Sequence, residues 1–216
     1  MRFNFCYHIR MDRFVLDTNL FFNMEPGLGL GKKSEEVIAA ATLGMKGLKQ
    51  SKTAEFFMPP SVVSEFLSFF EDHAQQFLKD FLAEVTVKSP DLTKVQFPSS
   101  VFHRLVEDIR ARSYKGLNIA EEEVKNMANL LNNQTTKLEK MEFEKKTGVV
   151  INKLRERYRQ ATRTGFLDSV SDLELIVLAR ELEGTLVSTD EGVIAWGRIF
   201  GVKEMDSVHF GHYLSR

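Results

Sequence analysis

The sequence is poor in cysteine, in long apolar runs and in net charge, and each shortage excludes a class of protein. Its 216 residues include one cysteine, Cys6, which rules out a disulfide framework and a cysteine-based zinc site. The longest apolar runs, of which Leu175 to Ala179 is one, are far shorter than the roughly 20 residues that span a bilayer. Residues 1–10 lack the apolar core of a signal peptide, and we expect either an N-terminal extension or a short edge strand there. These features favour a reduced, cytoplasmic protein without a membrane partner.

The charges nearly cancel, with 29 Lys and Arg against 30 Asp and Glu. Taken as a sum, this balance argues against a nucleic-acid binder, because phosphate partners favour a basic surface. The charges are unevenly spread, however. Residues 101–165 contain 14 basic and 9 acidic residues, a net charge of +5, which leaves −6 for the rest of the chain. Residues 101–165 are therefore basic enough to bind RNA.

Strand-like and helix-like segments alternate along most of the chain. Short apolar runs predict strands at 14–16, 56–58 and 185–187, with a last strand at 202–204. Helices are expected from Ser34 to about 48, from Ser61, over about 74–84, from Ser99 to about 115, from Ser169 and from Asp190. This alternation predicts an α/β fold, with a Rossmann-like parallel sheet flanked by helices.

The pattern changes over residues 117–165, which are highly charged and contain no proline. The stretch is long enough for two helices, with possible breaks at 132–134 and at Gly148. Its apolar residues form only a thin stripe, so we expect a protruding helical hairpin insertion and not a layer of the main fold. The α/β domain is then discontinuous and comprises residues 11–116 and 166–216.

Acidic residues follow two of the predicted strands. Asp17 comes directly after the first strand, and Asp190 follows 185–187. Glu65 and Asp172, near the starts of helices, could point into the same crevice, because the working site of an open α/β sheet lies beyond the carboxyl ends of its strands. Oxygen ligands without His or Cys suit Mg²⁺ or Mn²⁺, and not zinc.

Each acid except Asp17 also has a structural interpretation. Ser169 and Asp172 match a capping box, and Asp190 could cap its helix. Asp17 differs, because an acid directly after a buried strand is costly without a partner. Asp172 and Glu174 point about 200° apart on a regular helix. We therefore expect Asp172 to bind a metal directly. Glu174 would instead contact one of the direct ligands, or reach the metal through a water molecule.

Several sequence blocks resemble a known family. FVLDTN, SVVSEF and SDLELIVLARELEGTLVSTDEG are similar to the signature motifs of PIN-domain nucleases. Together with KGLNIAEE, VINKLRERYRQA and VKEMD, they resemble the minimal protein-only ribonuclease P family of bacteria and archaea (HARP) over about residues 12–206. The resemblance implies a PIN-like fold and a Mg²⁺-dependent endoribonuclease that removes the 5′ leader of precursor tRNA and leaves a 5′-phosphate.

The resemblance also implies roles for particular residues. The implied catalytic residues are Asp17, Glu65, Asp172, Glu174 and Asp190. Three of these acids, Asp17, Asp172 and Asp190, would hold Mg²⁺ (or Mn²⁺), with Ser188 or Thr189 as supporting hydroxyls. Many relatives have a second aspartate where this chain has Glu174.

Basic residues of the insertion predict an RNA-binding surface. Arg155, Arg159 and Arg163 recur every four residues and form one stripe on a helix, with side chains roughly 6 Å apart. Such a stripe suits sequence-independent, salt-sensitive contacts with phosphates, although a solvated face balanced by acids is the alternative. The full set of predicted RNA contacts is Arg110, Arg112, Lys115, Lys153, Arg155, Arg157, Arg159 and Arg163.

The thin apolar stripe of the insertion also needs a partner. The resemblance implies homo-oligomers built from dimers, with precursor tRNA as substrate and no protein or RNA subunit required. Two other functions stay open, a toxin-type PIN ribonuclease and a non-catalytic RNA-binding scaffold. A haloacid-dehalogenase-like phosphatase is disfavoured, because it needs a second aspartate where Asn19 stands.

Overall fold

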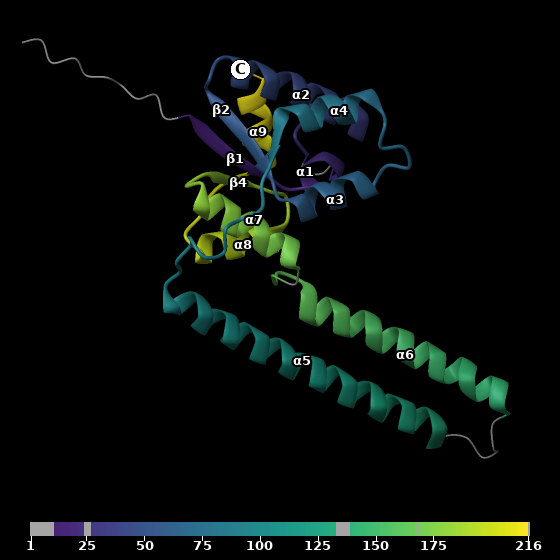
Figure 1. Cartoon of the computed structure of the whole chain (residues 1–216). Helices are drawn as coiled ribbons and strands as arrows, with labels where there is room; N and C mark the ends of the chain where they lie inside the picture. Colours follow the sequence, from purple (N-terminus) through teal and green to yellow (C-terminus); the bar gives the residue numbers. More distant parts are fainter. Residues whose placement is uncertain (1–10, 24–26, 133–138, 168, 216) are drawn as a thin grey trace, which may run out of the picture. The chain divides into compact units, whose positions relative to one another are not determined.

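The computed structural model describes residues 11–23, 27–132, 139–167 and 169–215 (Figure 1). The chain divides into two compact units, one made of the residues up to 97 and from 167 on, the other of residues 98–166. The edge strand considered for residues 1–10 lies outside the described residues.

Within the described residues, a five-stranded sheet that is parallel throughout forms the centre of the first unit. Its strands are β1 (Asp12–Leu16), β2 (Ala54–Met58), β3 (Val85–Val87), β4 (Thr185–Val187) and β5 (Lys203–Met205). They lie in the order β3-β2-β1-β4-β5, so β1 is central. All carboxyl ends therefore meet at one edge of the sheet, and the α/β fold with a PIN-like parallel sheet is confirmed.

Helices cover both faces of this sheet. They are α1 (Asn19–Phe22), α2 (Ser34–Gln50), α3 (Pro60–Ser68), α4 (Gln76–Glu84), α7 (Val170–Glu181), α8 (Glu191–Ile199) and α9 (Ser207–Leu214). Figure 1 shows α2, α4 and α9 on one side of the sheet and α7 and α8 on the other. On the α9 side, the ring of Phe14 stacks on Phe56 at 5.8 Å and meets Phe210 at 5.2 Å. Aromatic rings fully buried in this way supply much of the hydrophobic stabilisation.

The ends of β1 and β4 are joined by the backbone. The N–H of Asp17 donates to the carbonyl oxygen of Val187 at 3.0 Å. Residue 17 and the residues after Val187 are therefore held side by side, although 170 positions separate them in the sequence. This contact brings two of the predicted catalytic segments together.

The second unit is a pair of helices, α5 (Ser99–Asn132) and α6 (Lys140–Arg163). A Cβ at Gly116 would lie 2.5 Å from the ring of Tyr158, so only glycine lets this ring pack against α5. Arg112 donates from Nη1 to the carbonyl oxygens of Thr162 and Thr164, each at 3.0 Å. Its side chain therefore caps the last turn of α6 and ties α5 to it.

The helical unit differs from the prediction at two points. We placed its start at residue 117, but the compact unit begins at residue 98, because α5 is uninterrupted across residues 116 and 117. A break at Gly148 is also wrong, since α6 runs through this residue. The described part of α5 reaches Asn132, and the possible break at 133–134 lies outside the described residues.

In the first unit, α3 begins at Pro60, one residue before the predicted Ser61. The elements α1, β3 and α9 were not predicted at all. No helix in the described parts of the chain combines the length and the apolar character needed to cross a membrane.

Candidate active site

Asp17 is the most deeply buried acid of the predicted site. It follows β1 at the carboxyl edge of the sheet, and only 4% of its surface is exposed. Ser188 Oγ donates a short hydrogen bond to Asp17 Oδ2, and the N–H of Asn19 lies 3.5 Å from Asp17 Oδ1. Ser188 therefore fixes the orientation of this carboxylate, as expected for a supporting hydroxyl.

Burial raises the pKa of the Asp17 carboxyl from 3.8 to about 6. The hydrogen bonds from Ser188 and from the backbone of Asn19 act in the opposite direction, because they favour the charged form. The negative charges of Glu65 and Asp190 raise the pKa further, so both acids lie within electrostatic reach of Asp17. A cation placed among these carboxylates would stabilise their ionised forms.

Asp190 caps α8 and is also linked to Asp17. Its Oδ1 accepts hydrogen bonds from the N–H groups of Gly192 at 2.7 Å and Val193 at 3.0 Å, so the structural interpretation of this acid is confirmed. Its own N–H donates to Ser188 Oγ at 2.9 Å. Ser188 thus bridges the two aspartates, and the helix cap uses only one carboxylate oxygen of Asp190.

Thr189, the other predicted hydroxyl, points to a different neighbour. Its Oγ1 accepts a long hydrogen bond of 3.5 Å from Asn23 Nδ2. Between the two candidate hydroxyls, Ser188 is the one that contacts Asp17.

Glu65 is exposed on α3, and Asp172 is half-buried in the first turn of α7. The N–H of Asp172 donates to Ser169 Oγ at 3.3 Å, which confirms Ser169 as the N-cap of α7. Glu174 Oε2 accepts a short hydrogen bond from Ser61 Oγ, at the start of α3. The contact with Ser61 was not predicted, because 113 positions separate the two residues and no local pattern links them.

Within the described residues, no three His, Cys, Asp or Glu side chains are gathered closely enough to hold a metal ion. That Asp17, Asp172 and Asp190 hold one ion together therefore stays a prediction. Asp190 is engaged at its helix cap, and like-charged carboxylates repel one another when no cation lies between them. The donor set still suits a hard divalent cation, because a buried acid, a hydroxyl and further acids supply only oxygen ligands.

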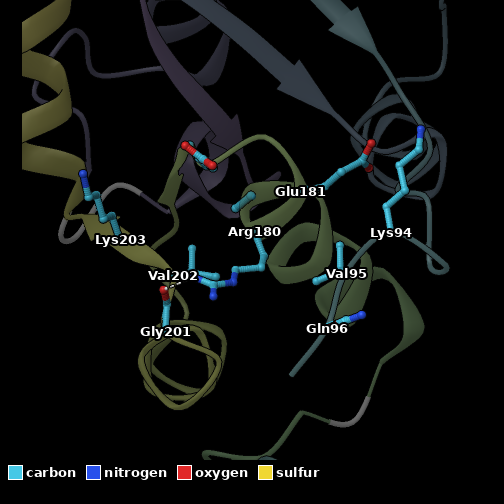
Figure 2. A pocket seen from close by; sticks show the side chains of 11 residues that line it. Lys94, Val95, Gln96, Arg180, Glu181, Gly201, Val202 and Lys203 are labelled. Atoms are coloured by element: carbon cyan, nitrogen blue, oxygen red, sulfur yellow. Dashed lines mark hydrogen bonds between the residues drawn. The ribbon is translucent and has the colours of Figure 1, made fainter. Parts of the chain in front are cut away.

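A hollow of about 600 Å³ lies at the other edge of the sheet, by the amino ends of β4 and β5 (Figure 2). Lys94, Arg180 and Lys203 lie around it. Arg180 Nη1 donates to the carbonyl oxygen of Gly201 at 3.2 Å, which stabilises the chain just before β5. The hollow is separate from the predicted catalytic residues, which follow the carboxyl ends of the strands.

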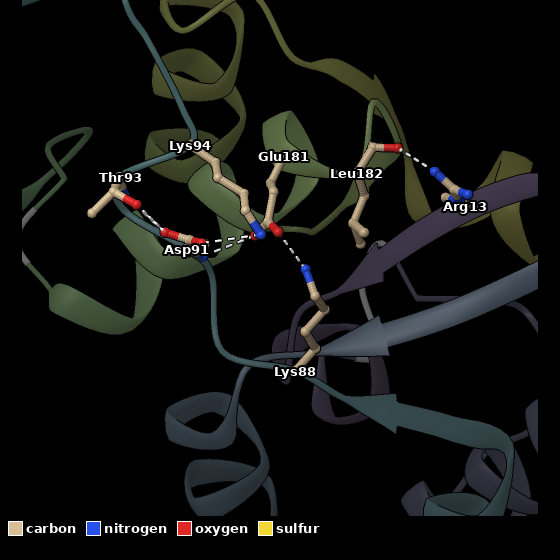
Figure 3. Close-up of polar contacts among 7 residues, drawn as sticks. All are labelled: Arg13, Lys88, Asp91, Thr93, Lys94, Glu181 and Leu182. Atoms are coloured by element: carbon tan, nitrogen blue, oxygen red, sulfur yellow. Dashed lines mark hydrogen bonds and ion pairs between the residues drawn. The ribbon is translucent and has the colours of Figure 1, made fainter.

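Figure 3 shows the polar contacts that fix the segment after β3. Lys88 Nζ lies 2.5 Å from Glu181 Oε1, and the N–H of Asp91 donates to Glu181 Oε2 at 2.9 Å. Asp91 is in turn paired with Lys94 at 3.1 Å. These charges attach the segment to the end of α7, so they have a structural role.

The predicted RNA contacts divide into two groups. Arg112, Lys153 and Arg157 make contacts inside the helical unit. Arg112 pairs with Asp108 at 3.0 Å, and both Lys153 and Arg157 reach the carboxylate of Glu123. These contacts give the three residues a structural role inside the unit, and their contact with RNA stays a prediction.

The remaining predicted RNA contacts are exposed: Arg110, Lys115, Arg155, Arg159 and Arg163. Arg159 pairs with Glu156 at 3.3 Å, but both side chains are more than half exposed. Surface pairs of this kind are weak and exchange readily with solvent. Such a weak pair leaves the Arg159 side chain able to contact phosphates.

Comparison with known proteins supports the nuclease interpretation. The sequence matches the PINc-domain ribonuclease family over residues 13–216. It is 34% identical to the RNA-free ribonuclease P of Pyrococcus horikoshii over 95% of this chain and 92% of that protein. The RNA-free ribonuclease P proteins of Pyrococcus abyssi and Thermodesulfovibrio yellowstonii are 36% and 33% identical, over 94% of this chain and 92% and 93% of theirs. Nucleases with PIN domains generally depend on a divalent metal ion. The chain therefore belongs to the RNA-free ribonuclease P family of PINc-domain ribonucleases and is an endoribonuclease.

Proposed function

We propose that this protein is a metal-dependent ribonuclease P that removes the 5′ leader from precursor tRNA without an RNA or protein subunit. The name RNA-free ribonuclease P, carried by relatives that match almost the whole chain, supports this substrate and the lack of an RNA subunit. The structural observation that carries the proposal is the buried Asp17, which is bound by Ser188 and lies within electrostatic reach of Glu65 and Asp190.

In this proposal Asp17, Asp172 and Asp190 hold Mg²⁺, for which Mn²⁺ can substitute. The bound ion would supply an activated water and stabilise negative charge at the scissile phosphate. The oxygen-only donor set and the raised pKa of Asp17 support such an ion, since a divalent cation would offset both burial and carboxylate repulsion.

The protein's own residues orient these groups. Ser188 holds Asp17 and receives the N–H of Asp190, so one hydroxyl sets the relative position of two aspartates. Ser61 holds one oxygen of Glu174, which links the starts of α3 and α7. Glu65 and Glu174 would position the attacking water. Its oxygen forms the new bond to phosphorus, the leader's 3′ oxygen leaves, and the products carry a 5′-phosphate and a 3′-hydroxyl.

The helical unit would bind the RNA. Its exposed basic residues include the stripe of Arg155, Arg159 and Arg163, together with Arg110 and Lys115. Guanidinium groups spaced by one helical turn suit successive phosphates and need no base contacts. Binding of this kind would depend strongly on salt.

The helical unit would also join two copies of the chain. Apolar side chains are exposed along α5 at intervals of three, four and seven residues, which places many of them on related faces. Five of these exposed side chains are Phe102 at 57%, Val106 at 56%, Ile109 at 49%, Leu117 at 55% and Val124 at 67%. A second copy of the helical unit would cover such a stripe, so we propose a homo-oligomer built from dimers.

The decisive variant for the site is Asp17→Asn, with Asp12→Asn as its control. Asp12 begins the same strand at the opposite edge of the sheet, where its exposed carboxylate accepts a hydrogen bond from Tyr213 at 2.7 Å. Asp17→Asn should lower cleavage of precursor tRNA by more than about a hundredfold. Binding to the RNA should change little, and Asp12→Asn should cleave like the unmodified protein.

Three outcomes would redirect the proposal. Full activity of Asp17→Asn would remove Asp17 from the site. Metal-dependent cuts within the mature tRNA would favour a toxin-type PIN ribonuclease. Tight binding without any cleavage by the unmodified protein would favour an RNA-binding scaffold.

A further inference from the structure

Glu123 is a buried carboxylate that the proposed catalysis does not use. It lies on α5 of the helical unit, and only 1% of its surface is exposed. A buried charge is costly unless oppositely charged groups and hydrogen bonds surround it. The groups that contact the Glu123 carboxylate therefore indicate its role.

Two cations from α6 reach this carboxylate. Arg157 Nη1 lies 2.5 Å from Glu123 Oε1, and Lys153 Nζ lies 3.2 Å from the same oxygen. Asn126 donates to Glu123 Oε2 at 3.3 Å, so both oxygens are occupied. The hydrogen bond from Arg157 is the main cause that lowers the pKa of Glu123, which keeps the group ionised at neutral pH.

Arg157 also contacts a second acid, because its Nη2 lies 2.6 Å from Glu122 Oε2. The group formed by Glu122, Glu123, Lys153 and Arg157, hereafter the Glu123 cluster, contains two positive and two negative charges. The cluster has no net charge to offer a phosphate. Its two cations therefore serve the contact between α5 and α6.

The cluster also determines which way α6 is turned. Lys153 and Arg157 are four residues apart and lie on one side of the helix. Arg155 is two residues from each, which places it about 200° around the helix axis, on the far side. Arg159 and Arg163 continue the Arg155 side at intervals of four residues. Binding of Lys153 and Arg157 to Glu123 thus leaves the arginine stripe turned away from α5.

We propose that Glu123 is a positioning residue for RNA binding: by holding Lys153 and Arg157 against α5, it sets the rotation of α6 and directs Arg155, Arg159 and Arg163 toward the RNA. The inference rests on the proposed function, because it assumes that this stripe contacts precursor tRNA. In this inference, Lys153 and Arg157 affect RNA binding by positioning the arginine stripe, and not by contacting phosphates themselves.

Charge and position predict different patterns of KM for two single variants, and they differ in sign for Glu123→Gln. Glu123→Gln makes the unit more positive, whereas Arg157→Gln makes it more negative. If net charge near the RNA were decisive, the first would lower KM for precursor tRNA and the second would raise it. If position is decisive, both should raise KM by about three- to tenfold, while kcat at saturating substrate stays within about twofold. The double variant should raise KM by less than the product of the two single effects.

Glu121→Gln is the matched control. Glu121 lies on the same helix two residues away and is exposed, so its substitution changes the charge equally without touching the cluster. It should leave KM within about twofold of the unmodified protein. Should a single variant fail to fold, the double variant serves in its place, because it keeps the total charge while it removes the contact between Arg157 and Glu123. It also separates Lys153 and Glu122 from their partners in the cluster.

Hydrogen exchange without RNA separates this inference from the proposed function. Exchange over residues 147–161 should be faster in Glu123→Gln and Arg157→Gln than in Glu121→Gln. If the unmodified protein does not cleave precursor tRNA, the proposed function is wrong. The exchange data would still test whether the Glu123 cluster holds α6 against α5. Three results would overturn the inference about Glu123. These are hydrogen exchange that is unchanged in the variants, a KM that is unchanged in folded variants, and shifts of KM in opposite directions in the two single variants.

Discussion

Replacement of Asp17 by asparagine should make the metal-free protein more stable although it removes activity. The Asp17 carboxyl has a pKa of about 6 in the folded protein against 3.8 ordinarily. A difference of this size costs about 3 kcal/mol of folding free energy at neutral pH. The folded state holds its proton more tightly than the unfolded chain. The contribution of the Asp17 carboxyl to the free energy of unfolding is therefore fully present below pH 3.8, and it is lost as the pH rises from 3.8 through about 6.

The hydrogen bonds of Asp17 reduce the expected gain. Ser188 donates to one carboxylate oxygen, and the N–H of Asn19 lies 3.5 Å from the other. An asparagine has a single acceptor oxygen, so one of these interactions must rearrange, at a cost of about 1 kcal/mol. The net gain at pH 7.5 is then about 2 kcal/mol, which corresponds to a rise in Tm of about 4–8 °C for a chain of this length.

Thermal unfolding in EDTA measures this effect. Asp17→Asn should melt above the unmodified protein at pH 7.5, and its advantage should vanish or reverse at pH 4, where the folded aspartate is already protonated. Added Mg²⁺ should raise the Tm of the unmodified protein and leave that of the variant nearly unchanged. A variant that is no more stable than the unmodified protein at pH 7.5 in EDTA would refute the reasoning about burial.

Three further predictions concern other parts of the molecule. Replacing Arg155 and Arg159 by alanine should weaken binding of precursor tRNA and reduce the slope of log Kd against log salt by about 0.7–0.9 for each lost phosphate contact, as measured by titrations at several salt concentrations. Ser61→Ala should raise the Mg²⁺ concentration for half-maximal cleavage, because Glu174 loses the hydroxyl that holds it, and Ser61→Thr should restore the value. Val106→Glu should shift the protein to a smaller assembly in analytical ultracentrifugation, because it places a charge in the exposed apolar stripe of α5.

Much of the sheet and of its acidic edge could be predicted from local patterns. The central strands β1, β2 and β4 are short apolar runs followed by Asp17, Pro59 and Ser188, which mark their ends clearly. The cap at Asp190 also follows from local residue types. By contrast, β3 has three residues, of which only Val85 is buried, so its position depends on pairing with β2 and not on its own sequence.

The contacts that the sequence did not reveal join distant residues. Ser61 reaches Glu174 across 113 positions, and Arg157 reaches Glu123 across 34. Which charges pair depends on the register of two packed helices, and a stripe of basic residues looks the same in the sequence whether it faces RNA or a carboxylate. For this reason the predicted RNA surface included Lys153 and Arg157, which the structure places in the Glu123 cluster.

The most direct test of the proposed function is to incubate the purified protein with a 5′-labelled precursor tRNA, with Mg²⁺ and with EDTA. The structure and the relatives together predict a single cut at the mature 5′ end, which depends on Mg²⁺ and leaves a 5′-phosphate on the tRNA. No cleavage, cleavage that persists in EDTA, or cleavage within the mature tRNA would contradict the proposal.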